Sequence, residues 1–319
     1  MGLTNKNAQD EAKRLFDFLW ENRGRKIILG QHTQTMEQAE LAFIREVTGE
    51  LPALCGFELL AYSPNIRYEE SGEACLKEVY EAGQTLKKAW EWAKMGGLIT
   101  FAWHWFSPLY GRDKSFYTEN TDFNAELAVT PGTPEYYAFL SDMDYMAGLL
   151  RPFCDAHVPV LWRPFHENEG AWFWWGNCKK DVVRKLYGLM YDRYVNHFKL
   201  NNLIWVFNST NPECYPGDDV ADIISRDLYP EAHCHTDHAK ELRELAAITK
   251  AEKPYAIAEI GTIPDVEAVI GNRIPWSYYM TWSNEFGRTE QYTSKEELKK
   301  AYFFENAVTL SRLPKFYCV

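Results

Sequence analysis

The chain has 319 residues, 46% of them hydrophobic and 25% charged, which allows a large buried core and is unlike the composition of a disordered protein. The net charge of −11, without any long basic run, excludes the phosphate contacts of a nucleic-acid-binding protein. The sequence contains neither an apolar run long enough to span a membrane nor the apolar segment of a secretory signal, so the chain as given is expected to be soluble.

Short apolar strands alternate with amphipathic helices along the chain. The first helix, 9–22, has Ala12, Leu15 and Leu19 on one face. Thr133-Pro134 predicts a helix start, and Ser294 with Glu297 forms a capping box before the last helix. The other predicted helices are 35–47, 72–93, 133–153, 179–198 and 239–250. The predicted strands are 26–32, 51–57, 97–105, 158 to the break at Pro164, 203–207, 221–229, 254–261 and 276–282, with a long loop at 106–131.

Eight short, almost continuously apolar strands are typical of a parallel sheet that is covered on both faces. Eight of them alternating with helices predict a single (β/α)8 barrel domain, an α/β fold, over residues 1–319. The alternative is an open doubly wound sheet. That fold usually carries a Gly-x-Gly-x-x-Gly loop after its first strand, and this chain has none.

Polar and aromatic side chains follow most of the predicted strands. In a (β/α)8 barrel the active site lies at the C-terminal ends of the strands, so these side chains should meet there. The set is acidic, basic and aromatic, which favours an enzyme site over an ordinary loop surface. Its members are His32, Glu58, His104, Arg163, His166, Glu167, Asn208, Asp227, Tyr229, Glu259 and Trp282.

Two of these residues are suited to cleaving a glycosidic bond, which requires two carboxyl groups on opposite sides of the bond. Glu167 and Glu259 both end apolar runs, where burial raises a carboxyl pKa and neighbouring groups then decide its charge. Arg163 and Tyr229 are candidate donors to Glu259, which favours its charged, nucleophilic form. Glu167 lies beside His166 and the aromatic run 172–175, which suits a proton donor.

Four segments resemble glycoside hydrolase family 26, best known for endo-β-1,4-mannanases. The longest is Trp162-Arg-Pro-Phe-His-Glu167, followed by Gly170-x-Trp-Phe-Trp-Trp-Gly176, which is similar to the acid/base signature of that family. The other three match in the expected order and are Ala102-Trp-His-Trp105, Asp227-Leu-Tyr229 and Ala258-Glu-Ile-Gly261.

The resemblance implies a (β/α)8 barrel and a retaining double displacement, with Glu167 as the acid/base and Glu259 as the nucleophile. The two carboxyl groups should then lie about 5–5.5 Å apart. It also implies a β-mannan-type substrate, a monomer without metal or cofactor, and a secreted or cell-envelope location. Asn168-Glu169 and Ser283-Asn284 depart from the family pattern. The substrate-contacting positions would be His104, Arg163, His166, Trp172, Asp227, Tyr229 and Trp282.

Several alternatives remain open at this point. The substrate could be mixed-linkage β-glucan or β-1,3-xylan, the enzyme could release mannobiose from chain ends, or the barrel could only bind carbohydrate. The segment His233–His238 contains three imidazoles and a thiol, which raises a metal site as a weaker hypothesis. Among the seven cysteines, only Cys214 with Cys234 is considered as a disulfide. Glu58 and His32 are expected to support the structure, and only Trp172 of the aromatic run is expected to bind sugar.

Overall fold

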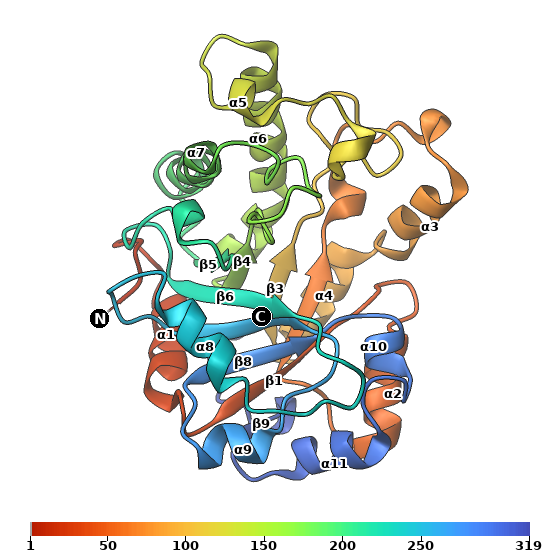
Figure 1. Ribbon diagram of the computed structural model, residues 1–319, viewed down its shortest axis with the longest axis vertical. Helices are drawn as coiled ribbons and strands as arrows, with labels where there is room; N and C mark the ends of the chain where they lie inside the picture. The colour runs from red at the N-terminus through yellow and green to blue at the C-terminus, as the bar shows by residue number, and fades with distance from the viewer. Residues whose placement is uncertain (1) are drawn as a thin grey trace.

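The computed structural model describes residues 2–319 and shows a closed barrel of eight parallel strands (Figure 1). Each strand pairs with the next in chain order, and β8 pairs with β1 to close the barrel. The short strand β9 (Ala307–Val308) pairs with β1 as well. The barrel strands are β1 (Ile27–His32), β2 (Leu54–Glu58), β3 (Leu98–Ala102), β4 (Val160–Arg163), β5 (Leu203–Asn208), β6 (Ile223–Leu228), β7 (Tyr255–Ile260) and β8 (Trp276–Thr281).

Helices surround the barrel, and Figure 1 shows α6 and α7 on the side opposite to α9 and α11. Because both faces of the sheet are covered, every residue of β1, β2, β3, β4, β5 and β8 is buried. The single (β/α)8 barrel predicted from the strand pattern is therefore confirmed. The helices are α1 (Asp10–Asn22), α2 (Ala39–Thr48), α3 (Glu73–Glu81), α4 (Thr85–Lys94), α5 (Ala125–Ala128), α6 (Pro134–Asp155), α7 (Lys180–Tyr191), α8 (Ala239–Ala246), α9 (Val266–Gly271), α10 (Glu285–Arg288) and α11 (Lys295–Phe303).

Two predicted helix starts are found with their caps. The Thr133 hydroxyl accepts the backbone N–H of Tyr136 (3.2 Å) at the start of α6. The Ser294 hydroxyl accepts the backbone N–H of Glu297 (3.2 Å) at the start of α11. Each cap satisfies a donor that the first helical turn leaves free, so these local patterns predict the boundary without help from the rest of the fold.

The single helix predicted at 72–93 is wrong, because the chain forms α3 and α4 with a break between them. In a continuous helix the carbonyl of Glu81 would accept the N–H of Thr85. It accepts the N–H groups of Thr35 (2.9 Å) and Met36 (3.2 Å) instead. The Thr85 hydroxyl donates to the carbonyl of Glu58 at the end of β2 (2.7 Å). The break is therefore caused by contacts with distant loops, which the helical period cannot reveal.

Other boundaries also differ from the prediction. The helix predicted at 179–198 leaves α-geometry after Tyr191 and continues as a π-helical turn, Asp192–His197. The loop predicted at 106–131 contains α5 and a 3₁₀ turn, Thr118–Asn120. The short elements α9, α10 and β9 were not predicted. Within residues 2–319, no helix has both the length and the apolar character required to cross a bilayer.

Candidate active site

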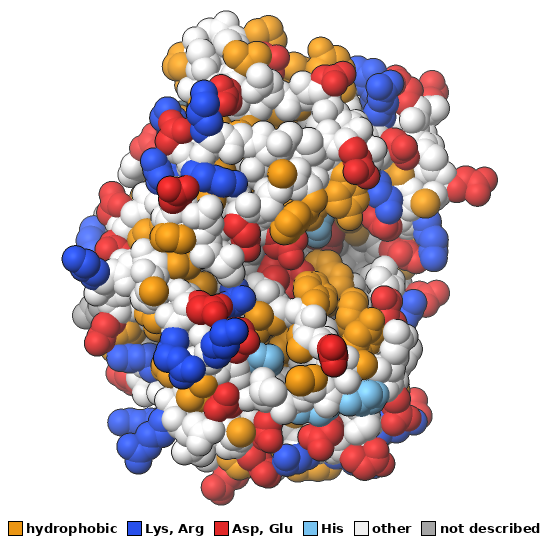
Figure 2. All heavy atoms as spheres, in the orientation of Figure 1, with side chains coloured by type: hydrophobic (Ala, Val, Ile, Leu, Met, Phe, Trp, Pro, Cys, Tyr) orange, Lys and Arg blue, Asp and Glu red, His pale blue; other side chains and the backbone are white. Residues whose placement is uncertain are grey.

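A cleft of ≈ 450 Å³ lies over the C-terminal ends of β8, β1, β2 and β3. Figure 2 shows a hollow near the centre of this face, with acidic side chains at its floor and hydrophobic ones on its rim. The lining includes His32, Glu58, His104, Tyr117 and Trp282. Four of these residues were predicted strand-end residues, so the barrel brings them to one opening as its geometry requires.

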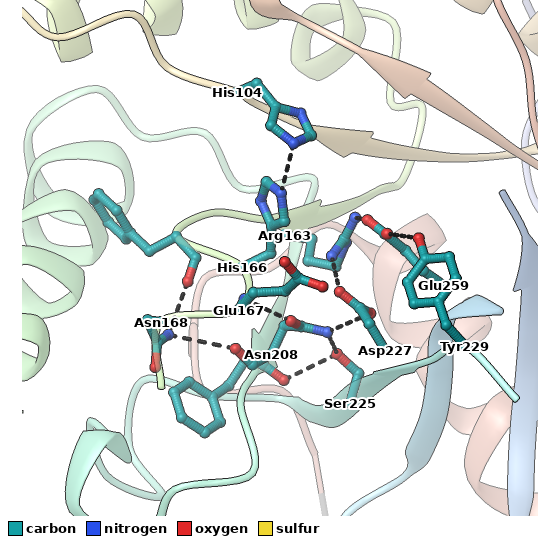
Figure 3. Close-up of polar contacts among 12 residues, drawn as sticks. His104, Arg163, His166, Glu167, Asn168, Asn208, Ser225, Asp227, Tyr229 and Glu259 are labelled. Atoms are coloured by element: carbon teal, nitrogen blue, oxygen red, sulfur yellow. Dashed lines mark hydrogen bonds and ion pairs between the residues drawn. The ribbon is translucent and has the colours of Figure 1, made fainter. Parts of the chain in front are cut away.

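Arg163, the last residue of β4, is buried among the carboxyl groups of Glu167, Asp227 and Glu259, which together form the acidic group of the site (Figure 3). Its guanidinium donates to Asp227 Oδ2 (3.1 Å) and to Glu259 Oε1. Burial alone would lower the pKa of Arg163, but the charges of Glu259 and Asp227 outweigh burial and raise it. The Tyr229 hydroxyl donates to Glu259 Oε2 (2.7 Å). Both oxygens of Glu259 therefore act as acceptors, as those of an ionised carboxylate do.

Glu167 follows β4 in the left-handed region of backbone space, with φ 52°. Its backbone N–H donates to Asn208 Oδ1 (2.8 Å), and its Oε2 accepts the indole N–H of Trp172 (2.9 Å). Burial, and then the charge of Glu259, raise the pKa of Glu167 to about 7. Glu167 therefore holds a proton at a pH where an ordinary glutamate has lost it.

One carboxylate oxygen each from Glu167, Asp227 and Glu259 lies within 4.8 Å of the others. This close spacing fits the retaining arrangement better than the wider one that leaves room for a water molecule between the carboxyl groups. The same three atoms could surround a cation, but Arg163 already pairs with two of the three carboxylates. In the described part of the chain, the segment His233–His238 supplies no such converging group.

Two histidines from neighbouring strands lie between the acidic group and the cleft. Nε2 of His104 and Nε2 of His166 are 3.2 Å apart. His104 Nδ1 lies 2.7 Å from Glu58 Oε2. The ring of His32 stacks on Trp282, with centroids 4.0 Å apart. Imidazoles and one indole therefore form the inner wall of the cleft.

The aromatic run after Glu167 divides as the sequence predicts. Trp172 is 47% exposed, whereas Phe173, Trp174 and Trp175 are buried. The indole N–H of Trp174 donates to the carbonyl of Trp105 (2.8 Å), and that of Trp175 donates to the carbonyl of His166 (2.8 Å). The two buried indoles therefore hold the loop that carries Glu167, and Trp172 alone remains available to a ligand.

Two asparagines, Asn208 and Asn168, have contacts in the site that the sequence alone does not reveal. Asn208 ends β5, and besides accepting from Glu167 its amide donates to Asp227 Oδ1 (2.8 Å). It thereby links the loop after β4 to β6. Asn168, one of the departures from the family pattern, is fully buried and donates to the carbonyl of Asn208 (3.3 Å). Their positions after strands were visible in the sequence, but their partners were not.

The cysteine hypothesis receives no support from the structure. Cys214 is buried with its thiol 3.7 Å from the carbonyl of Asn168, whereas Cys234 is exposed. Both are free thiols, and so are the other five cysteines. Cys214 therefore packs as a small buried side chain beneath the loop after β4.

A (β/α)8 barrel with two close carboxyl groups, one after β4 and one at the end of β7, beside an exposed indole, is the architecture of a barrel glycoside hydrolase. Comparison with known proteins identifies the family. Residues 4–312 match the model of glycosyl hydrolase family 26, and the chain belongs to that family.

Named relatives and solved structures agree with this assignment. A mannan endo-1,4-beta-mannosidase from Thermothelomyces thermophilus is 36% identical over 98% of this chain, and mannan endo-1,4-beta-mannosidase A from Piromyces sp is 32% identical over 98%. The chain spans 63% and 51% of the length of these two relatives.

Among solved structures, the Podospora anserina GH26-CBM35 beta-(1,4)-mannanase has a TM-score of 0.87 and 32% identity, covering 98% of this chain and 69% of that one. A beta-mannanase from a symbiotic protist of the termite Reticulitermes speratus, complexed with gluco-manno-oligosaccharide, has a TM-score of 0.87 and 31% identity. That comparison covers 98% of this chain and 97% of the other.

Proposed function

We propose that the chain is a retaining endo-β-1,4-mannanase domain that cleaves internal bonds of mannan, glucomannan or galactomannan. The observation that carries the proposal is the pair Glu167 and Glu259. The two carboxyl groups lie close together. The pKa of Glu167 is raised to about 7, whereas both oxygens of Glu259 accept hydrogen bonds from Arg163 and Tyr229. The names of the relatives at 36% and 32% identity support mannan as the substrate class.

In the first step, Glu259 attacks the anomeric carbon of the sugar on the glycone side of the bond. Glu167 gives its proton to the glycosidic oxygen, the bond between that oxygen and the anomeric carbon breaks, and the aglycone leaves. A covalent glycosyl–enzyme ester at Glu259 results. In the second step, Glu167, now a carboxylate, takes a proton from water, and the water oxygen attacks the anomeric carbon. The Glu259 carboxylate leaves, and the product keeps the β configuration.

The neighbouring residues have roles that follow from their contacts. Arg163 and Tyr229 donate to Glu259, which keeps it charged before attack and orients it toward the sugar. Asp227 balances the charge of Arg163. Asn208 holds the backbone of Glu167, so that the proton donor stays opposite the nucleophile.

The cleft over β8, β1, β2 and β3 is assigned to the glycone side of the bond. Trp282 offers an indole face there and His104 offers a ring nitrogen to a sugar hydroxyl. His166 lies buried against His104, and Trp172 lies next to the proton donor. Flat aromatic rings suit the apolar faces of sugars, and their polar handles suit a half-wet groove.

The test is a panel of glucomannan, galactomannan, barley β-glucan and xylan, read for new reducing ends. Cleavage of the two mannans, with the β-anomer formed first in NMR spectra, is the expected result. Cleavage of β-glucan or xylan alone would show that the substrate is one of those polysaccharides and not mannan. An α-anomer as the first product would contradict the retaining mechanism. Rapid formation of long products indicates endo cleavage, whereas mannobiose as the sole early product would contradict it.

We also propose that residues 1–319 act as one monomeric catalytic domain outside the cytoplasm, where polysaccharides are found. The single closed barrel supports one domain. Light scattering of the purified chain tests the monomer, and fractionation of the source cells tests the location.

A further inference from the structure

Glu58 is a buried carboxylate to which the cleavage steps assign no role. It ends β2, is 6% exposed and uses both oxygens on neighbours. Its Oε1 accepts the backbone N–H groups of His104 (2.7 Å) and Leu60 (2.9 Å). Its Oε2 lies 2.7 Å from His104 Nδ1. One carboxylate therefore contacts both the backbone N–H and the ring of His104, and these two contacts orient the imidazole.

This contact also determines where His104 carries its proton. An ionised carboxylate only accepts hydrogen bonds, so His104 Nδ1 must bear hydrogen. Nε2 of His104 then faces Nε2 of His166 at 3.2 Å. Burial, and then the nearby charge of Arg163, hold the pKa of His166 far below its usual value, so His166 is neutral. Its Nδ1 has no partner within the described chain.

The charge of His104 is decided by groups on four other strands or strand ends, β1, β2, β4 and β7. Burial disfavours its protonation, but the carboxylates of Glu58 and Glu259 outweigh burial, Arg163 opposes them, and the net effect raises the pKa of His104. His166, His32 and Glu167 are further titratable groups close to it. Glu58 is the carboxylate in direct contact with His104, so it contributes most to holding the imidazole in its charged form.

We propose that Glu58 is a positioning residue that sets the orientation and protonation of His104, and through it the hydrogen-bond direction of the His104–His166 pair beside the cleft. Protonated His104 donates from Nε2, either to His166 or to a hydroxyl of the sugar held at the cleavage point. This inference rests on the proposed function for the identity of the ligand, but the arrangement of the three side chains does not depend on it.

The first experiment needs no substrate. Long-range ¹H–¹⁵N spectra resolve the imidazoles of the eight histidines, and His104→Gln assigns the signal of His104. The wild type is expected to show a proton on His104 Nδ1 and a titration midpoint above that of an ordinary histidine side chain. In Glu58→Gln the midpoint falls, because the carboxylate that favoured the charged ring is gone. In Glu58→Asp, which keeps the charge, the midpoint remains nearer the wild-type value.

Activity gives the second readout. Glu58→Gln is expected to lower kcat/KM on manno-oligosaccharides by about 10- to 100-fold, the range seen when partners behind metal-bound histidines are removed. In a His104→Gln background the same change should cost less than about twofold, because Glu58 acts through His104. Asp222→Asn is the matched control. Asp222 is also buried and accepts two backbone N–H groups, from Thr4 (2.7 Å) and Trp205 (2.8 Å), but it precedes β6 at the other end of the barrel.

An unchanged His104 titration in Glu58→Gln, or losses that multiply in the double variant, would overturn the proposal. If Glu58→Gln does not fold, the His104 titrations of the wild type and of Glu58→Asp test the proposal. A neutral wild-type His104 protonated only at Nε2 at pH 7 contradicts the inference. A protein that shows the expected spectra but cleaves no mannan would refute the proposed substrate and leave the positioning role of Glu58 intact.

Discussion

The two halves of the barrel mouth differ in how their polar groups are satisfied. Over β4 to β7, Arg163, Asp227, Tyr229 and Glu259 bond to one another, with every charge paired. Over β8 to β3, both buried ring nitrogens of His32 have no partner within residues 2–319, and the cleft of ≈ 450 Å³ lies beside them. In the first half, a single ring nitrogen, Nδ1 of His166, also has no partner in this part of the chain. Paired charges stay in place without a ligand, whereas buried polar atoms without partners gain when a ligand supplies hydroxyls. The first half is therefore suited to chemistry and the second to holding the sugar.

The largest test of this division is removal of the nucleophile. Glu259→Ala is expected to lower kcat on mannan by on the order of 10⁴-fold or more, since the covalent step is lost. The exposed Glu285→Ala is the control and should keep wild-type activity. Full activity of Glu259→Ala, measured by reducing ends, would refute the assignment of Glu259 as the nucleophile. It would also refute the assignment of catalysis to the half of the barrel mouth over β4 to β7.

Removal of the proton donor is expected to depend on the leaving group. Glu167→Ala should lower kcat on mannan by about 10²- to 10⁴-fold, but much less on an aryl β-mannoside whose phenolate needs no proton. The acid is active when protonated, and burial beside Glu259 raises its pKa to about 7, so wild-type activity should fall as pH rises through about 7. This basic limb should vanish for Glu167→Ala on the aryl substrate. If the limb persists unchanged, another group supplies the proton.

Removal of the Tyr229 hydroxyl tests how much its hydrogen bond to Glu259 contributes to catalysis. Tyr229→Phe keeps the ring and removes the donor 2.7 Å from Glu259. A hydrogen bond to a charged group contributes about 1.5–3 kcal/mol, so kcat/KM should fall by about 10- to 100-fold. Tyr137→Phe, at an exposed tyrosine of α6, is the matched control. Equal activity of the two variants would contradict a role for Tyr229.

The smallest expected effect concerns Trp172, at the border of the two halves. Trp172→Phe keeps an aromatic surface but removes the N–H that donates to Glu167 (2.9 Å). That donor stabilises the charged carboxylate, so its loss should raise the pKa of Glu167 further. The basic limb of the pH–rate profile should move to higher pH by less than about one pH unit, because the side chain is half exposed. A shift of the basic limb to lower pH would contradict the prediction that the Trp172 N–H stabilises the charged form of Glu167.

The barrel, and the positions of Glu167 and Glu259 at strand ends, could be predicted because the necessary signals are local. Each strand carries its own apolar run, and Glu167 and Glu259 stand at the ends of such runs. The break between α3 and α4 could not be predicted. It depends on the carbonyl of Glu81 accepting from Thr35 and Met36, whose positions follow only from folding. Likewise, Asn208 reads as one more strand-end amide until its partners are known.

The sequence alone determined the rhythm of strands and helices, the capped starts of α6 and α11, and the residues that meet at the barrel mouth. These follow from side-chain periodicity and backbone hydrogen bonding within a few residues. Only the tertiary structure decided which groups pair. In the folded chain, Arg163 pairs with Asp227 and Glu259, and Glu58 pairs with His104. The tertiary structure also left Trp172 exposed while burying Trp174 and Trp175. Charge and protonation depend on distance and burial, and folding creates both.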